Sequence, residues 1–152
     1  MTEADLFAKD LFARVLFARV VAGPISLEDC ATAVSADDAG AVVTFAGVVR
    51  DHDGGRSVVS LDYEAHPSAE VAIASVAASV AGEFPRVRIA IAHRVGSLAV
   101  GDLALAAAVS SAHRADAFAA CARLIDEVKL QVPIWKEQRF TDGSSEWVGS
   151  LG

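Results

Sequence analysis

Residues 129–137 read KLQVPIWKE, an apolar run that is bracketed by Lys129 and Lys136. The residues before this run favour a helix that ends near Lys129, and Pro133 prevents that helix from continuing. The chain around and after Pro133 is therefore expected to be extended and packed on at least one face by its apolar side chains. Such a turn folds the strand back beside the helix end and brings both ammonium groups to one pocket.

The two lysines allow more than one interpretation. A lysine in the last turn of a helix interacts favourably with the helix dipole, so Lys129 alone is explained by a solvated helix end. Lys136 is harder to explain in this way, because a lysine in a packed strand is rarely buried without a partner. Two neighbouring ammonium groups lower each other's pKa, which suits an amine that acts as an acid, a base or a nucleophile.

Outward from this segment, strands and helices mix without strict alternation, which is typical of the α+β class. Ser26 and Asp29 resemble a helix N-cap arrangement, and Pro85 follows the end of a second helix. The expected helices cover Ser26 to about Val34, 68–83 and 115–129, and the expected strands cover 39–50, 58–65, 87–96, 103–114 and 132–140, with a short return at WVG, 147–149.

The spacing of apolar residues predicts which faces are buried. The strand at 58–65 alternates, and it is expected to form a long hairpin with the strand at 39–50 through the Gly-rich loop at 51–57. The helix at 115–129 carries apolar residues at spacings of three and four. The side chains expected on these buried faces are Val59, Leu61 and Tyr63 in the strand, and Phe118, Cys121, Ala122 and Ile125 in the helix.

The N-terminus contains three pentads in tandem, LFAKD, LFARV and LFARV, from Leu6 to Val20. A period of five suits neither regular structure, since each copy advances by about 140° around a helix and changes face on a strand. We interpret the repeat as a tandem duplication whose early copies have no structural role and whose last copy begins the first strand. A membrane-surface helix is the alternative, although the segment lacks a polar face.

Composition excludes several classes of function. The formal net charge of −7 disfavours non-specific binding to nucleic acid, which requires a positive field. Cys30 and Cys121 lie far apart and no Cys/His cluster is present, so neither a disulfide framework nor a structural zinc site is expected. The N-terminus is a poor match to a signal peptide and no apolar run is long enough to cross a bilayer, so we expect a cytoplasmic protein.

Cationic side chains outside the lysine segment favour a small anionic ligand. His113 and Arg114 stand at an expected helix N-terminus, where free N–H groups and a bidentate guanidinium bind anions. Arg50 ends a strand where the chain enters a Gly-rich loop. Each has a plainer interpretation, as helix capping with an exposed arginine or as an ordinary strand-end arginine. His93, in the segment HRVG, is interpreted as structural.

Five segments together resemble one family. They are GVVRDHDGG, LDYEAHP, HRVGSLAVGD, SSAHRADAF and EVKLQVPIWKEQ followed by EWV, and they occur in this order within residues 20–149. On these motifs the chain is similar to the catalytic, or large, subunits of molybdopterin synthase. Each motif alone is weak evidence, whereas five in sequence are specific, above all the SAHR segment together with the two lysines.

The resemblance implies an α/β-hammerhead-type α+β fold with mixed and antiparallel sheets and two main helices. It also implies a homodimer in which each large subunit binds one small ubiquitin-like sulfur-carrier subunit, giving a four-chain complex. The carrier's C-terminal Gly-Gly thiocarboxylate would supply sulfur to cyclic pyranopterin monophosphate, and two transfers would give the dithiolene of molybdopterin. No cofactor is expected, and residues 1–19 would be an extension of a single catalytic domain at 20–152.

The same resemblance assigns the site. Lys129 would meet the carrier terminus and Lys136 would lie beside the pterin, which makes these two the expected catalytic residues. The cationic residues would bind the substrate phosphate, and some of them would arrive across the dimer interface. The full expected substrate-binding set is Val48, Val49, Arg50, His113, Arg114, Lys129, Lys136, Glu137 and Gln138.

Two departures and one alternative accompany this assignment. His66 stands where the family pattern has a tyrosine, and the pentads have no counterpart in it. A non-catalytic module that binds anions or docks a carrier would keep Arg50 and the His113–Arg114 pair, but it would not need both lysines. A purely structural α+β protein would need none of these residues.

Overall fold

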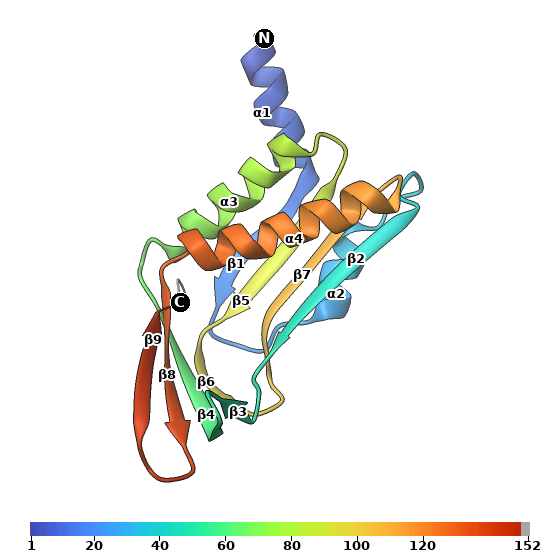
Figure 1. Cartoon of the computed structure of the whole chain (residues 1–152). Helices are drawn as coiled ribbons and strands as arrows, with labels where there is room; N and C mark the ends of the chain where they lie inside the picture. The colour runs from blue at the N-terminus through green and yellow to red at the C-terminus, as the bar shows by residue number, and fades with distance from the viewer. Residues whose placement is uncertain (150–152) are drawn as a thin grey trace.

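The computed structural model describes residues 1–149, which form an α+β fold with four helices and two sheets (Figure 1). The predicted class is confirmed, and α3 and α4, the longest helices, are accompanied by two shorter ones. In chain order the elements are α1 (Glu3–Arg14), β1 (Val15–Val21), α2 (Leu27–Val34), β2 (Ala41–Val48), β3 (His52–Asp53), β4 (Arg56–Ala65), α3 (Ala69–Glu83), β5 (Arg88–Arg94), β6 (Gly96–Ala99), β7 (Leu103–Ser111), α4 (Arg114–Gln131), β8 (Ile134–Phe140) and β9 (Ser145–Gly149).

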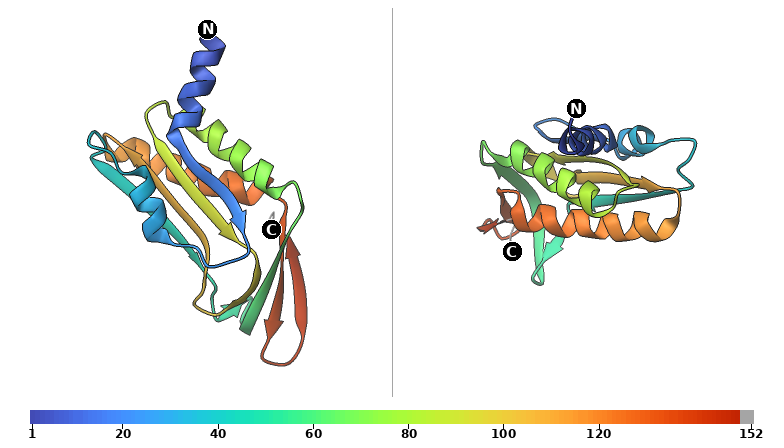
Figure 2. Two further views of the ribbon diagram at one scale, coloured as in Figure 1. Left: turned by 180° about the vertical axis from the view of Figure 1, so that it is seen from behind. Right: turned by 90° about the horizontal axis from the view of Figure 1, so that it is seen from above.

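The first sheet has the strand order β1-β5-β7-β2 and is covered on both faces. β1 runs parallel to β5, and the other neighbours are antiparallel. Helix α2 packs on one face, whereas α3 and α4 pack on the other (Figure 2). In the central strand β7, Ala106 and Ala108 face α2, while Ala107 and Val109 face α3 and α4. Small side chains on both faces of β7 therefore allow close helix packing on each side.

The second sheet is antiparallel and extends from one end of the first (Figure 1). Its strand order is β3-β4-β8-β9, and β6 also pairs with β4. A separate small core stabilises it, because Val58, Leu61, Leu98 and Phe140 are buried together with Val49 from the chain that enters the sheet. The candidate site lies where the two sheets meet.

Helix α4 connects the first sheet to the second. It ends at Gln131, Val132 is its extended C-cap, and β8 begins at Ile134, directly after Pro133. The Pro133 carbonyl accepts a hydrogen bond of 3.0 Å from the backbone N–H of His66, at the end of β4. The predicted helix stop and the extended segment after it are confirmed.

The predicted long hairpin between the strands at 39–50 and 58–65 is wrong. β2 pairs with β7 in the first sheet, whereas β4 pairs with β6 and β8 in the second. The chain changes sheets after Val48, where the N–H of Val49 donates to the Asp102 carbonyl at 3.0 Å. A short β3–β4 hairpin remains, and its turn residues Gly54 and Gly55 have φ of 57° and 78°, a combination that glycine tolerates at a two-residue turn.

One predicted face of β4 is partly wrong. Leu61 is buried and Tyr63 is partly buried, as the alternation predicts, but Val59 is 52% exposed. An irregularity in the pairing with β8 between Val58 and Ser60 shifts the alternation and turns Val58 inward. A bulge of this kind leaves no signal in apolar spacing.

The predicted stripe on α4 is also partly wrong. Cys121 and Ile125 are buried, but Phe118 is 61% exposed and Ala122 is exposed. The buried face instead follows a second series of residues with the same helical spacing, which includes Ala117 and Ala120. The residues on the buried face are Ala117, Ala120, Cys121, Leu124, Ile125 and Val128.

The pentads lie in two different elements. The first copy and all of the second except Val15 belong to α1, which has no buried residue. The third copy lies within β1, so the predicted first strand is confirmed. Because β1 begins at Val15, residues 15–19 of the predicted extension belong to the first sheet. No helix within residues 1–149 is long and apolar enough to cross a membrane.

The second pentad has a structural role, so the prediction that the early copies have none is wrong. Nη1 of Arg14 donates to the carbonyl oxygens of Ala81, Phe84 and Val87 at 2.9, 3.2 and 3.0 Å, around the C-terminal end of α3. Asp10 pairs with the same guanidinium at 2.8 Å. Carbonyls at a helix end lack partners within the helix, so Arg14 supplies donors where α3 needs them.

We predict that Arg14→Ala lowers the free energy of unfolding by about 2 kcal/mol, because hydrogen bonds from a charged donor are lost. Urea denaturation measures this change. Lys9→Ala is the matched control, since Lys9 holds the same place in the first pentad and is exposed. Equal stability changes in the two variants would contradict the role assigned to Arg14.

Candidate active site

A pocket opens beneath the C-terminal end of α4, and both predicted lysines line it. Lys129 comes from the last turn of α4, and Lys136 comes from β8 after the turn at Pro133. The remaining lining residues, drawn from β4, β5, β7, the end of α4, β8 and β9, are Tyr63, His93, Leu105, Val128, Val132, Ile134 and Gly149. The pocket therefore combines apolar walls with two lysines, one histidine and one tyrosine.

Lys136 is the more buried of the two lysines, whereas Lys129 is exposed. Burial lowers the pKa of Lys136, and the positive charges of Lys129 and Arg50 lower it further, while Asp53 opposes both effects. A lowered pKa increases the fraction of neutral amine at a given pH. Lys136 is therefore better able than a solvated lysine to accept a proton or to attack a carbonyl carbon.

His93 and Tyr63 form the inner wall of the pocket. Their rings meet edge to face with centroids 5.2 Å apart, and His93 Nδ1 lies 2.8 Å from the Arg94 carbonyl. Because a carbonyl can only accept, Nδ1 carries the proton and Nε2 is left as an acceptor. Burial lowers the pKa of His93 to about 4 and raises the pKa of Tyr63, so both are neutral at pH 7.

Sequence reasoning missed these two residues as members of the site. The segment HRVG favours a structural role for His93, and the alternation of apolar residues places Tyr63 only on a buried face of its strand. The alternation of β4 indicates that Tyr63 points inward, but only the pairing of β4 with β8 shows that it stands opposite Lys136.

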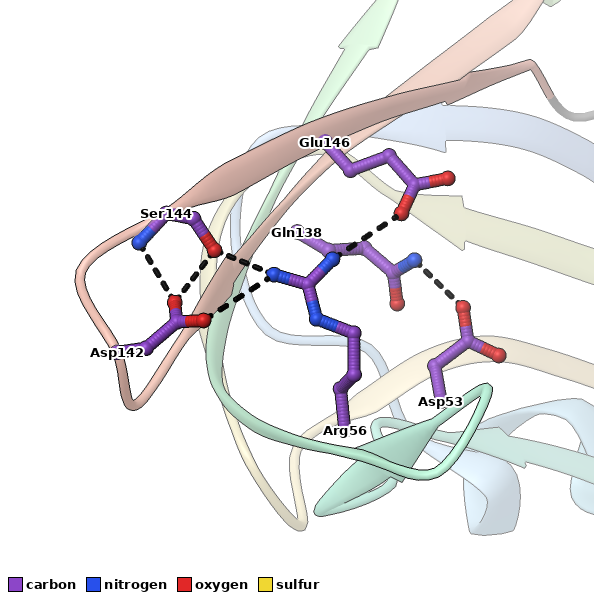
Figure 3. Close-up of polar contacts among 6 residues, drawn as sticks. All are labelled: Asp53, Arg56, Gln138, Asp142, Ser144 and Glu146. Carbon is purple, nitrogen blue, oxygen red and sulfur yellow. Dashed lines mark hydrogen bonds and ion pairs between the residues drawn. The ribbon is translucent and has the colours of Figure 1, made fainter.

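A second polar group adjoins the lysine pocket. Gln138 is 2% exposed, and its Nε2 donates to Oδ2 of Asp53 at 2.7 Å (Figure 3). The other carboxylate oxygen of Asp53 pairs with Nη2 of Arg50 at 3.4 Å. This hydrogen bond from Gln138 is the main reason that the pKa of Asp53 is lowered. The predicted residues Arg50 and Gln138 thus meet through Asp53, which sequence reasoning did not single out.

The other predicted residues, at the end of β2, just after it and in β8, are not gathered in the pocket. Val49 is buried in the small core of the second sheet, and Val48 is 50% exposed. Glu137 pairs with Arg139 at 3.4 Å and lines a different hollow, with Trp147. Successive residues of a strand face opposite ways, so Glu137 points away from the side of Lys136 and Gln138.

His113 and Arg114 lie at the far end of α4. Both are exposed, and His113 is the N-cap residue of the helix. Arg114 and Lys129 are fifteen positions apart, and a rise of 1.5 Å per residue places them about 22 Å apart along the helix. Within one chain, the structure does not bring this pair to the lysine pocket.

The comparison with protein families gives the observation that decides the identity. The model of the MoaE family, described as "MoaE protein", matches residues 20–131. The chain belongs to the MoaE family. This range includes Arg50, the His113–Arg114 pair and Lys129, while α1 precedes it and β8 follows it.

Relatives of the MoaE chain extend the match over most of its length. The molybdopterin synthase catalytic subunit of Nostoc sp. is 42% identical over 131 residues, which cover 85% of this chain and 79% of that one. Catalytic subunit 1 of Mycobacterium tuberculosis is 40% identical over 127 residues, covering 83% and 86%. The MoaE chain is accordingly a catalytic subunit of molybdopterin synthase, an enzyme of molybdenum cofactor biosynthesis.

Solved structures show the same fold. Molybdopterin synthase from Staphylococcus aureus superposes with a TM-score of 0.82 at 37% identity, covering 88% of this chain and 97% of that one. A chain from the complex of subunits 1 and 2 of the molybdopterin-converting factor of Helicobacter pylori has a TM-score of 0.66 at 18% identity, covering 86% and 88%.

The depressed pKa of His93 predicts a pH-dependent stability. Between about pH 6.5 and pH 4 the unfolded chain binds a proton at this residue and the folded chain does not, so stability falls as the pH is lowered through this window. The complete loss is about 3 kcal/mol. Replacing His93 with Gln should reduce the difference in unfolding free energy between pH 7 and pH 5, measured with urea.

His113→Gln serves as the control, because it removes an exposed histidine from the other end of α4. This variant should keep the wild-type dependence on pH. If the stability of His93→Gln depends on pH as strongly as that of His113→Gln, the buried neutral histidine is not the source of the pH dependence.

Proposed function

We propose that this catalytic subunit transfers sulfur from the C-terminal thiocarboxylate of a small carrier subunit to cyclic pyranopterin monophosphate. In each transfer the sulfur leaves the carrier's terminal acyl carbon and forms a C–S bond to a side-chain carbon of the pterin, where a C–O bond breaks. The displaced oxygen leaves as water or stays on the phosphate. On the carrier, water supplies the oxygen that replaces sulfur on the acyl carbon, either directly or after a lysine amine has held the acyl group. Two such transfers give the dithiolene of molybdopterin.

One observation carries this proposal: Lys129 and Lys136 line the same pocket. The thiocarboxylate and the pterin phosphate are both anionic, so two cationic side chains complement them. Lys129 is exposed and is proposed to meet the carrier terminus, while the more buried Lys136 is proposed to lie beside the pterin. The lowered pKa of Lys136 fits a role in proton transfer or in acyl attack.

We further propose the assembly in which this reaction takes place. Two catalytic subunits of hammerhead-type fold form a dimer, and each binds one ubiquitin-like carrier with a C-terminal Gly-Gly, all in the cytoplasm. In Helicobacter pylori, a chain of this fold is found in a complex of two kinds of subunit. A dimer also offers a use for His113 and Arg114, which are too far from the lysines of their own chain to share a substrate with them.

The proposed substrate-binding residues then fall into two groups. Arg50, Lys129, Lys136 and Gln138 surround or adjoin the pocket of their own chain. His113 and Arg114 would reach the pocket of the other subunit, where the guanidinium can bind the phosphate in bidentate fashion. The substrate-binding role of the remaining three residues, Val48, Val49 and Glu137, stays a prediction. A bound pterin or carrier would have to contact them outside the lysine pocket.

The lysine assignment predicts that Lys129→Ala and Lys136→Ala each reduce dithiolene formation by orders of magnitude, while carrier binding persists through apolar contacts around its tail. Lys9 is the remaining lysine of the chain, and Lys9→Ala should leave dithiolene formation and carrier binding unchanged. Single-turnover product formation and carrier affinity are the two measurements. Lys136→Arg should rescue little, because guanidinium does not release its proton. Near-normal product formation by both Ala variants would overturn the proposal.

The dimer assignment predicts complementation between two impaired proteins when the precursor is subsaturating. Arg114→Ala should weaken binding of the precursor phosphate by about 1.5–3 kcal/mol, the cost of a lost hydrogen bond to a charged group. If Arg114 acts across the interface, mixing Arg114→Ala with Lys136→Ala subunits assembles dimers with one complete site. Dithiolene formation should then return after subunit exchange. A mixture no more active than its components, although mixed dimers form, would place both residues in the same chain's site.

A further inference from the structure

Asp53 is held in one position by its neighbours. Its two carboxylate oxygens have different partners, since Oδ2 accepts from the buried amide of Gln138 at 2.7 Å and Oδ1 pairs with Arg50 at 3.4 Å. In β8 the side chains of Lys136 and Gln138 are two residues apart and share one face of the strand. The Gln138 amide, which holds Asp53 in place, thus lies on the same side of β8 as the Lys136 amine.

The hairpin that carries Asp53 is itself attached to β8 and β9. Asp53 is the backbone pairing partner of Arg56 across the β3–β4 turn. The Arg56 guanidinium is hydrogen-bonded to Ser144 and forms ion pairs with Asp142 at 3.4 Å and with Glu146 at 3.9 Å (Figure 3). Its guanidinium carbon also lies 3.7 Å from the centroid of the Phe140 ring. These contacts hold the hairpin against the strand that carries Lys136.

We infer that Asp53 is a positioning residue of the active site, whose carboxylate is held by Gln138 on the Lys136 side of β8 and balances the positive charge of that lysine. This inference deepens the proposed function, because it concerns the protonation of the same lysine. It requires no contact between Asp53 and the substrate. Gln138 contributes by keeping the carboxylate in place.

The charges around Lys136 support this inference. Among the groups in residues 1–149 that shift its pKa, Asp53 alone favours the ammonium form. The groups that face Lys136 from the surrounding elements are Asp53 from β3, Arg50 from the loop after β2, Tyr63 from β4, His93 from β5 and Lys129 from α4. Without Asp53, Lys136 would stand beside two cations and two neutral rings.

The Asp53 side chain is 39% exposed, so solvent and salt screen its charge. The effect on Lys136 is therefore expected to be a modest shift that decreases with ionic strength. Its direction is independent of the chemical role of the lysine. Whether the neutral amine or the ammonium form is the active one, the limb of the pH–rate profile that belongs to Lys136 moves to lower pH when Asp53 loses its charge.

Asp53→Asn tests this inference, with Asp51→Asn as the matched control. Asp51 lies two residues before Asp53, and its side chain is 78% exposed. It pairs with His52 and is not among the groups that shift the pKa of Lys136. Two readouts are needed: the pH–rate profile of dithiolene formation, and the titration of Lys136 by ¹³C NMR of the reductively methylated protein. The Lys136 signal is assigned with Lys136→Arg.

We expect Asp53→Asn to lower the Lys136 titration midpoint and to move the matching kinetic limb in the same direction, while Asp51→Asn changes neither. Asp53→Glu should restore part of the shift. A loss of rate at every pH, with the Lys136 titration unchanged, would show that Asp53 is only structural and would overturn the inference. If the wild-type protein forms no dithiolene at all, the proposed function fails, while the NMR titration still decides the role of Asp53.

Discussion

The end of helix α4 at Pro133 is the constraint on which the site depends. Without the proline, α4 would run on and carry Lys136 away from the second sheet. Proline cannot continue a helix, so the chain turns and enters β8, where Lys136 stands opposite Tyr63 of β4. The hydrogen bond from His66 to the Pro133 carbonyl fixes the turn to the same strand. Two lysines seven positions apart thereby meet at one pocket.

The packing of small residues makes this arrangement possible. β7 is buried almost throughout, and its alanines allow α2 on one face and α3 with α4 on the other. The helix that carries Lys129 in its last turn therefore lies directly over a rigid sheet. Because His93 and Leu105 come from neighbouring strands of that sheet, the inner wall of the pocket belongs to the best-packed part of the molecule. Precise placement of catalytic groups needs such support.

The sequence predicts the local structure well because local rules decide it. Ser26 caps α2 by accepting a hydrogen bond from the N–H of Asp29, and α3 ends at Glu83, before Pro85, as expected. The convergence of the two lysines follows from the same kind of reasoning, since a single turn connects them. Apolar spacing is less decisive where two series overlap, as on α4, or where a bulge shifts the register, as at Val58.

Strand partners and the rest of the site could not be derived in this way, because they depend on contacts between distant segments. β2 and β4 are neighbours in sequence but belong to different sheets. Tyr63, His93 and Asp53 reach the lysines only through those pairings. Arg14 is a further case, since a five-residue repeat that fits neither helix nor strand does not indicate that its second copy contacts the end of α3.

The central claim is that the lysine pocket carries out sulfur transfer and does not merely bind the carrier or an anion. Reconstitution of the wild-type protein with a thiocarboxylated carrier and cyclic pyranopterin monophosphate tests it most directly. The account predicts that dithiolene product forms and that the thiocarboxylate is consumed in step with it. Tight binding of both the carrier and the pterin without any dithiolene product would contradict it, and would identify a docking module instead of an enzyme.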